Sequence, residues 1–292
     1  MAKRSVGLIP ERKDLSLITK FYDNISRQIK SVVMGLLSDG YSEAGAMRVR
    51  QKVEALVHRL NVFASGWTRK ALRDAYKEAI KIGTVRMQVL GLEPNPEFDK
   101  NVHKKTIDTY RDDTFGILVK ANASIIENVN ALLFMVRAAS EKMGQFQAWD
   151  MRDEVVISNL MDELIAAGET RTAAKKAVLS HFAKIMGDGN FININGRNYN
   201  LKNYAELVGR TRLRKVQSQA TVNLAKQYDN DLVEVSDHNS EFDDICLEYE
   251  GNVYSLFGKT PGYDVLPDYP PWHPNCEHSI FPTSEEAVSL RG

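Results

Sequence analysis

Apolar residues recur at helical spacing through most of the stretch from about residue 12 to residue 185. Between Leu118 and Val136 they step by three or four positions, and the charged Glu127 falls off this stripe. A similar stripe runs from Val53 to Trp67. Residues three and four apart lie on one face of an α-helix. The pattern therefore predicts long amphipathic helices whose apolar faces serve core or helix–helix packing rather than cofactor binding.

Glycine and proline clusters mark the predicted ends of these helices, because glycine favours the left-handed cap and proline cannot continue a helix. A further short helix is predicted from Glu154 to Ile165. The predicted breaks are Gly35 with Ser38-Asp39-Gly40, Gly91 with Pro94 and Pro96, and Gly168 with Thr170.

From Gly187 onwards the spacing changes from helical to β-like. The β-prone run Phe191–Ile194 precedes the pair Asn195-Gly196, and Tyr199 follows it. Asn-Gly between two such runs favours a two-residue turn in which both central residues have positive φ. The sequence therefore predicts a β-hairpin here.

A long helix is predicted next, from Asn203 to Tyr228. The segment Asp231–His238 then alternates apolar and polar residues, and Gly251–Gly258 is a short β-prone run between glycines. Both patterns predict strands. The remainder of the chain is rich in proline-containing turns.

These elements predict a fold of two parts. Residues 1–185 are expected to form a mostly α N-terminal region, with long helices in a bundle or an extended arm. Residues 186–292 are expected to form a smaller C-terminal α+β domain.

Composition agrees with a globular protein. The chain has 292 residues, of which 43% are hydrophobic, more than disordered chains carry. No apolar run reaches the about 20 residues that span a bilayer, and no apolar segment follows the charged start as it does in a secretory signal. Two cysteines do not make a disulfide framework. We therefore expect no membrane contact and a reducing compartment, the cytoplasm.

The formal net charge is zero, with 38 Lys and Arg against 38 Asp and Glu, but the charges are unevenly distributed. From Asp229 to Gly292 there are 14 acidic residues against Lys259 and Arg291, whereas the predicted helix upstream is basic. Such segments favour complementary surfaces, within the chain or between copies, or a surface that meets phosphate. A solvated helix face is the plainer alternative. The candidate contacts to double-stranded DNA, which would be non-specific, are Arg210, Arg212, Arg214 and Lys215.

The fragment Pro270–Pro282, PPWHPNCEHSIFP, concentrates metal-binding residue types in a segment whose prolines exclude a helix. It holds one of the two cysteines and two of the six histidines. Together with the upstream cysteine they form a Cys2His2 set, which is typical of structural zinc sites. A reduced, buried thiol pair with hydrogen-bonded histidines is the alternative. The candidate ligands are Cys246, His273, Cys276 and His278.

The same fragment is expected to act as a structural clasp. Its prolines favour an extended path, and its two large aromatic side chains are expected to be buried. The sulfur and imidazole groups would then hold the fragment to the preceding strand. The clasp residues are Trp272, Pro274, Asn275 and Phe281.

No catalytic residue is predicted. A nucleophilic Cys276 would need a base, a group that orients the base and an oxyanion site, and spacing shows neither of the last two. The motif Gly187-x-Gly189 is not followed by the lysine that a phosphate-binding loop needs. We therefore expect no enzymatic activity. A metal-dependent hydrolase or nuclease that uses the Cys/His cluster, and a non-specific DNA-binding accessory protein, are the alternatives.

Several motifs of the C-terminal third occur in a specific order: Arg210-Thr211 in a helix, Cys246, the strand Gly251–Ser255 and the ending HPNCEH at His273–His278. This order resembles the phage minor capsid and head-morphogenesis proteins of the Mu F-like group, over about residues 187–283. Two positions depart from the usual pattern of that group. Glu277 replaces an arginine, and Tyr249 replaces the second cysteine of an upstream Cys-x2-Cys pair.

The resemblance implies a structural virion component present in few copies, which acts in head morphogenesis at or near the portal vertex. The partners that it implies are the portal protein, the major capsid or scaffolding protein, and packaged double-stranded DNA. The implied location is the virion, in the capsid interior or at the portal vertex, after assembly in the host cytoplasm. A long helical N-terminal part is also expected for this group.

Overall fold

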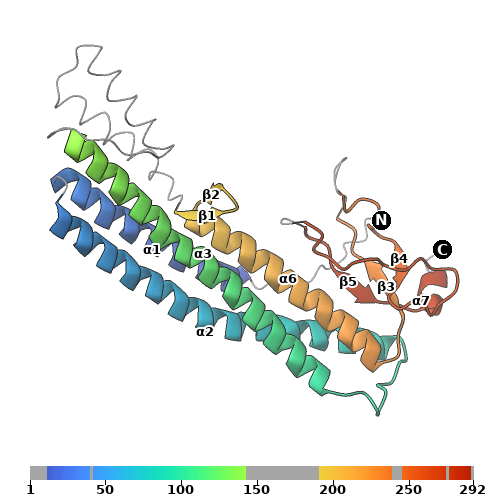
Figure 1. Ribbon diagram of the computed structural model, residues 1–292. Coiled ribbons are helices and arrows are strands. Elements are labelled where there is room, and N and C mark those ends of the chain that lie inside the picture. The colour runs from blue at the N-terminus through green and yellow to red at the C-terminus, as the bar shows by residue number, and fades with distance from the viewer. Residues whose placement is uncertain (1–11, 40–41, 143–190, 239–244, 274–275, 291–292) are drawn as a thin grey trace. The chain divides into compact units, whose positions relative to one another are not determined.

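The computed structural model describes residues 12–39, 42–142, 191–238, 245–273 and 276–290 (Figure 1). Three long helices come first: α1 (Arg12–Asp39), α2 (Glu43–Val89) and α3 (Asn101–Lys142). The elements that follow are β1 (Ile192–Ile194), β2 (Arg197–Tyr199), α6 (Leu201–Gln227), β3 (Leu232–Val235), β4 (Val253–Ser255), β5 (Ile280–Pro282) and α7 (Glu285–Ser289). The predicted fold class, long N-terminal helices with a smaller α+β part at the C-terminal end, is confirmed.

The helix ends agree with the glycine and proline signals. α1 ends at Asp39, although Gly35 lies inside it. After α2, the left-handed Gly91 (φ 71°) donates to the carbonyl of Gln88, and the N–H of Leu92 donates to the carbonyl of Met87, both at 3.0 Å. These two bonds form a Schellman cap.

Three predictions fall on parts of the chain that the structure does not describe. They are the helix from Glu154 to Ile165, the turn at Gly168 and Thr170, and the domain boundary near residue 185.

The chain forms two compact units, and each of the four long helices contributes residues to both. The unit that contains the three-stranded sheet, here the sheet unit, comprises Met1–Ile18, Ser65–Gly116 and Glu206–Gly292. The unit that contains the β1–β2 hairpin, here the hairpin unit, comprises Thr19–Ala64 and Ile117–Ala205. These units divide the chain differently from the predicted domains 1–185 and 186–292, since each draws on both sides of that boundary.

The predicted apolar stripe of α3 lies in the core of the hairpin unit. Leu118, Ile125 and Val129 are buried, whereas Glu127 is exposed. The helix is therefore oriented by the burial of its apolar face, as the spacing predicts.

The predicted hairpin is present and lies on α3. Asn195 (φ 52°) and Gly196 (φ 80°) form the turn, as the pairing of Ile194 with Arg197 requires. Side chains of α3 hold the hairpin: Asn128 Nδ2 donates to the carbonyl of Phe191 at 2.9 Å, and the N–H of Asn193 donates to Ser124 Oγ at 3.1 Å.

One segment within α3, Asn101–Phe134, is long and apolar enough to cross a membrane by length and composition alone. Core helices of globular proteins meet the same criterion, and 44% of the relevant window is buried inside the structure. One of its buried polar side chains also bonds to another helix: Asn122 Nδ2 donates to Asn61 Oδ1 at 2.8 Å. These contacts are those of a core helix.

A polar network joins three helix segments inside the sheet unit. Asn223 on α6 donates to Tyr76 on α2 at 2.9 Å and to Thr106 on α3 at 2.8 Å. Tyr76 Oη lies 2.7 Å from His103 Nδ1, and His103 Nε2 lies 3.1 Å from Gln227 Oε1. The amide oxygen can only accept, so Nε2 carries the proton and Nδ1 accepts from the Tyr76 hydroxyl. Burial raises the pKa of Tyr76 to about 12, which keeps that donor protonated.

The C-terminal sheet is built around β3, with the order β4-β3-β5 and antiparallel pairing on both sides. Its apolar face packs on the end of α2 and on α6 in one core, which includes Met87, Leu224, Val233, Val235 and Ile280. Val233 and Val235 share the face that packs on the helices, and Leu232 on the other face of β3 is buried as well. This packing positions the segments that carry the cysteines and histidines.

Candidate functional site

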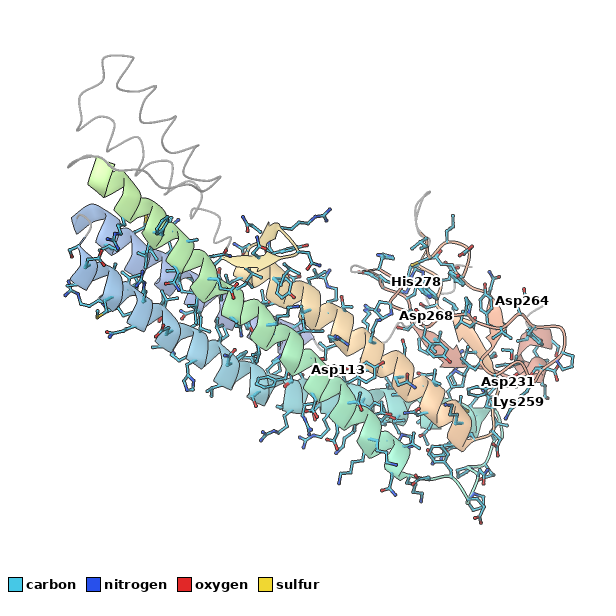
Figure 2. The ribbon with its side chains drawn as sticks, in the orientation of Figure 1. Asp113, Asp231, Lys259, Asp264, Asp268 and His278 are labelled. Carbon is cyan, nitrogen blue, oxygen red and sulfur yellow. The ribbon has the colours of Figure 1, made fainter. Side chains whose placement is uncertain are left out.

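The proline-rich fragment leads into β5. The N–H of Cys276 donates to the carbonyl of His273 at 3.1 Å. Ser279 and Ser236 exchange hydrogen bonds of 2.9 Å, and the fragment then continues as β5 beside β3. The pairing of β5 with β3 fixes where His278 lies (Figure 2).

The two aromatic side chains predicted for the clasp are buried to different extents. Phe281 is 7% exposed, and the Arg86 guanidinium lies 4.9 Å from its ring centre. Trp272 is half-buried; its ring stacks on Tyr249 with centres 4.5 Å apart, and its Nε1 donates to the Asp268 carbonyl at 3.3 Å. The other two predicted clasp residues, Pro274 and Asn275, lie outside the described part of the chain.

The four candidate ligands come together. Cys246 Sγ lies 3.6 Å from Cys276 Sγ and 3.1 Å from His273 Nε2. His278 Nδ1 lies 3.5 Å from Cys276 Sγ. Both cysteines and His278 are buried, and His273 is half-buried. The cluster thus connects two segments that lie 30 residues apart in the sequence.

Glu250 extends the cluster. Its Oε1 lies 2.7 Å from His278 Nε2, and the two side chains are 7% and 2% exposed. The same oxygen accepts from the N–H of His238 at 3.3 Å. The sequence shows Glu250 only as one acidic residue in a run of several, so its contact with His278 could not be predicted from it.

Hydrogen bonding shifts the titration of the buried thiol and imidazole towards their charged forms. Burial by itself raises the pKa of Cys276, but hydrogen bonds from His278, the backbone and Cys246 outweigh it and hold the pKa below its usual value. Burial by itself lowers the pKa of His278, but the bonds to Cys276 and Glu250 outweigh it and raise the pKa. Both pKa shifts are therefore in the direction of the charged form, the thiolate for Cys276 and the imidazolium for His278.

His238 lies beside the cluster without joining it. Its ring meets that of His278 edge-on, with centres 5.0 Å apart, and its Nε2 lies 2.8 Å from Ser236 Oγ. Burial and the neighbouring His278 lower the pKa of His238. His238 therefore packs against His278 at the edge of the cluster.

The predicted DNA contacts on α6 are not equivalent in the structure. Arg214 is 8% exposed and its Nη1 donates to the carbonyl of Glu277, so this guanidinium is not available to a phosphate. This burial corrects the predicted contact at Arg214. Arg210 pairs with Glu206 at 2.5 Å, whereas Arg212 and Lys215 are half-buried. The α6 helix buries most of its circumference, and that burial removes Arg214 from solvent.

A second polar centre, at Asp231, was not predicted from the sequence. Its carboxylate accepts hydrogen bonds from Ser255 Oγ (2.6 Å), Thr260 Oγ1 (2.8 Å) and the N–H groups of Phe257 (2.7 Å), Lys259 (3.0 Å) and Thr260 (2.8 Å). Figure 2 labels Asp231 beside Lys259. Burial by itself raises the pKa of Asp231, but these bonds outweigh it and lower the pKa. The loop after β4 is therefore folded around this carboxylate.

The arrangement of the cluster is suited to holding backbone segments together. Its sulfur and nitrogen atoms face one another, and one segment supplies Cys246 while the other supplies the remaining three groups. A reactive thiol would need an approach for a substrate, whereas both cysteines are at most 2% exposed.

Comparison with known proteins adds a family relationship. The sequence matches the family described as phage minor capsid protein 2 over residues 135–290, which is 156 of 292 residues. The match begins upstream of the predicted resemblance and includes the whole cluster. No curated protein and no solved structure matches the chain.

The match confirms the resemblance to phage minor capsid proteins, under a family description that does not name the Mu F-like group. A structural role in the virion, in association with other phage head proteins, follows from it. Because the match covers more than half of the sequence, the chain belongs to the phage minor capsid protein 2 family.

Proposed function

We propose that this protein acts in head morphogenesis as a structural component at or near the portal vertex. Its partners there are the portal protein and the major capsid or scaffolding protein. The observation that carries the proposal is the family match over residues 135–290.

An apolar face on α2 supports contact with another protein. Ile82, Val85 and Val89 are 38%, 56% and 81% exposed, and they follow one another at intervals of three and four residues. Side chains at this spacing share one side of a helix, and such faces dock into hydrophobic grooves or against other helices. We assign this face to the portal protein.

Co-expression with the portal protein of the same phage tests the proposal. We expect the two proteins to sediment together, and we expect Val85→Glu with Val89→Glu to reduce the co-sedimenting fraction at least about tenfold, because charges are costly in an apolar interface. Val62→Glu is the matched control, since Val62 is 61% exposed on the same helix. Free migration of the wild-type chain would contradict the portal assignment.

The hydrolase alternative receives less support from the buried cluster. Hydrolytic metal sites keep one coordination position open for water or substrate, whereas structural sites are filled by four protein ligands. We therefore propose that Cys246 and Cys276 hold the fold together. Metal-dependent nicking of a plasmid, abolished by Cys276→Ser in a variant that still folds, would restore the alternative.

Contact with packaged DNA, if the protein sits inside the capsid, rests on few cations. Of the four predicted contacts, Arg214 is buried and Arg210 is paired, so Arg212 and Lys215 remain as half-buried cations. We therefore expect weak binding to any duplex, with a slope of log K against log salt of about −2. The double variant Arg212→Ala with Lys215→Ala should abolish binding to duplex DNA, whereas Arg210→Ala should leave the affinity within about twofold of the wild type. A slope several times steeper would favour a dedicated DNA-binding protein.

A further inference from the structure

We propose that Cys246, His273, Cys276 and His278 bind one zinc ion in a closed tetrahedral site. The ion would join the turn at Cys246 to the fragment that leads into β5. This proposal is independent of the portal assignment, because the metal is measured on the purified chain.

Two of the separations between ligand atoms match those of a zinc-centred tetrahedron. With Zn–S bonds of about 2.3 Å and Zn–N bonds of about 2.0 Å, tetrahedral angles place two sulfurs about 3.8 Å apart and a sulfur and a nitrogen about 3.5 Å apart. The structure has 3.6 Å between the sulfurs of Cys246 and Cys276 and 3.5 Å between Cys276 Sγ and His278 Nδ1. The 3.1 Å from His273 Nε2 to Cys246 Sγ is shorter, so binding requires a small outward movement of that ring.

Three of the four ligand atoms already form one compact group. The sulfurs of Cys246 and Cys276 and one ring nitrogen of His273 all lie within 4.8 Å of one another. His278 lies outside this group but 3.5 Å from Cys276 Sγ, and its ring would have to move towards the other two ligands to supply the fourth donor. Four donors of this type complete a structural zinc site.

The hydrogen bond to Glu250 directs the correct nitrogen of His278 towards the group. A carboxylate can only accept, so His278 Nε2, at 2.7 Å from Glu250 Oε1, carries the proton. In neutral imidazole the other nitrogen, Nδ1, then has its lone pair available, and this is the atom that faces Cys276. Metal-binding histidines are commonly oriented by a carboxylate in this way.

Charge and burial agree with the same assignment. Two thiolates balance the charge of one Zn²⁺, which suits a place where both cysteines are at most 2% exposed. A disulfide is the main alternative for two close cysteines, but its sulfurs would have to move from 3.6 Å to about 2.05 Å.

Elemental analysis of the full-length chain, purified under reducing conditions, tests the proposal directly. We expect about one zinc per chain, retained on dialysis and removed by a strong chelator, with a fall in Tm of at least about 10 °C because metal binding and folding are coupled. Cobalt added to the stripped chain should give the visible bands of tetrahedral coordination and a thiolate-to-metal charge-transfer band, and zinc should displace it.

Variants separate the ligands from their surroundings. Cys246→Ser, Cys276→Ser and His273→Asn should each lose the charge-transfer signal or weaken it strongly. Glu250→Gln should keep four ligands but weaken zinc binding about 10–100-fold. His58→Asn, an exposed histidine on α2, is the matched control and should leave the zinc content unchanged.

Three results would overturn the proposal. One is a chain that is purified without zinc and whose Tm does not change when zinc is added. Another is a Cys246–Cys276 disulfide in the native particle. The third is a cobalt complex without thiolate bands, which would reduce any bound metal to an adventitious ion.

Discussion

Replacement of Asp231 by alanine is expected to lower the free energy of unfolding by about 3 kcal/mol, a large effect for one residue. The Asp231 carboxylate accepts five hydrogen bonds, three of them from backbone N–H groups of the loop that follows β4. Without the carboxylate these donors lose a charged acceptor, and hydrogen bonds to charged groups contribute about 1.5–3 kcal/mol each without being additive. Chemical denaturation with an unchanged m-value would measure the loss.

Asp229→Asn is the matched control, because Asp229 accepts one hydrogen bond from Asn95 at an exposed position and asparagine tolerates its left-handed backbone (φ 49°). That variant should lose less than about 1 kcal/mol. An Asp231→Ala variant as stable as the control would mean that water replaces the carboxylate at no cost, and the loop would then not depend on it.

The stability of the wild-type protein should depend on pH in a way that reveals the contribution of the Asp231 carboxylate. The pKa of Asp231 is lower in the folded chain than in the unfolded chain, because hydrogen bonds outweigh the effect of burial. Its contribution to stability is therefore fully present above the unfolded pKa of about 3.9 and is lost as the pH falls through the folded pKa. Asp231→Asn should flatten the acid limb of the stability curve relative to the wild type.

Asn223→Ala is expected to lower the free energy of unfolding by about 2–4 kcal/mol. Asn223 is 2% exposed and donates to Tyr76 on α2 and to Thr106 on α3, while its own oxygen accepts from Gln219 at 3.2 Å. The substitution removes these bonds and leaves a cavity where three helix segments of the sheet unit meet. Thermal and urea unfolding would give the change.

A double-mutant cycle with Tyr76→Phe isolates the contact between the two side chains. We expect a coupling of about 1 kcal/mol or more, since both groups belong to one buried network. Gln219→Ala on the same helix removes only the weaker bond and serves as the control. Additive effects of Asn223→Ala and Tyr76→Phe would show that the network is not cooperative.

Most of the described helices and strands could be predicted because their causes are local. The spacing of apolar residues fixed the buried face of α3 through Leu118, Ile125 and Val129. The pair Asn195-Gly196 sets a turn of positive φ whatever surrounds it. The prolines around Trp272 likewise exclude a helix by their own geometry.

Only part of the candidate site could be predicted from the sequence. Residue types and spacing within six positions indicated His273, Cys276 and His278, and the count of two cysteines added Cys246. Spacing along the chain contains no information about Glu250, because its contact with His278 spans 28 residues. The burial of Arg214 was missed for the same reason, since a basic residue on a helix is normally expected at the surface.

By itself, then, the sequence determined the long helices, the hairpin and the strands β3 and β4, and which residue types could bind a metal, whereas β5 and α7 were not predicted. The tertiary structure alone decided which carboxylate orients His278, which loop folds around Asp231 and which arginine side chain is buried. The physical reason is that backbone conformation depends on neighbours within a few residues, whereas these side-chain contacts depend on the pairing of β3 with β4 and β5 and on its packing against α6.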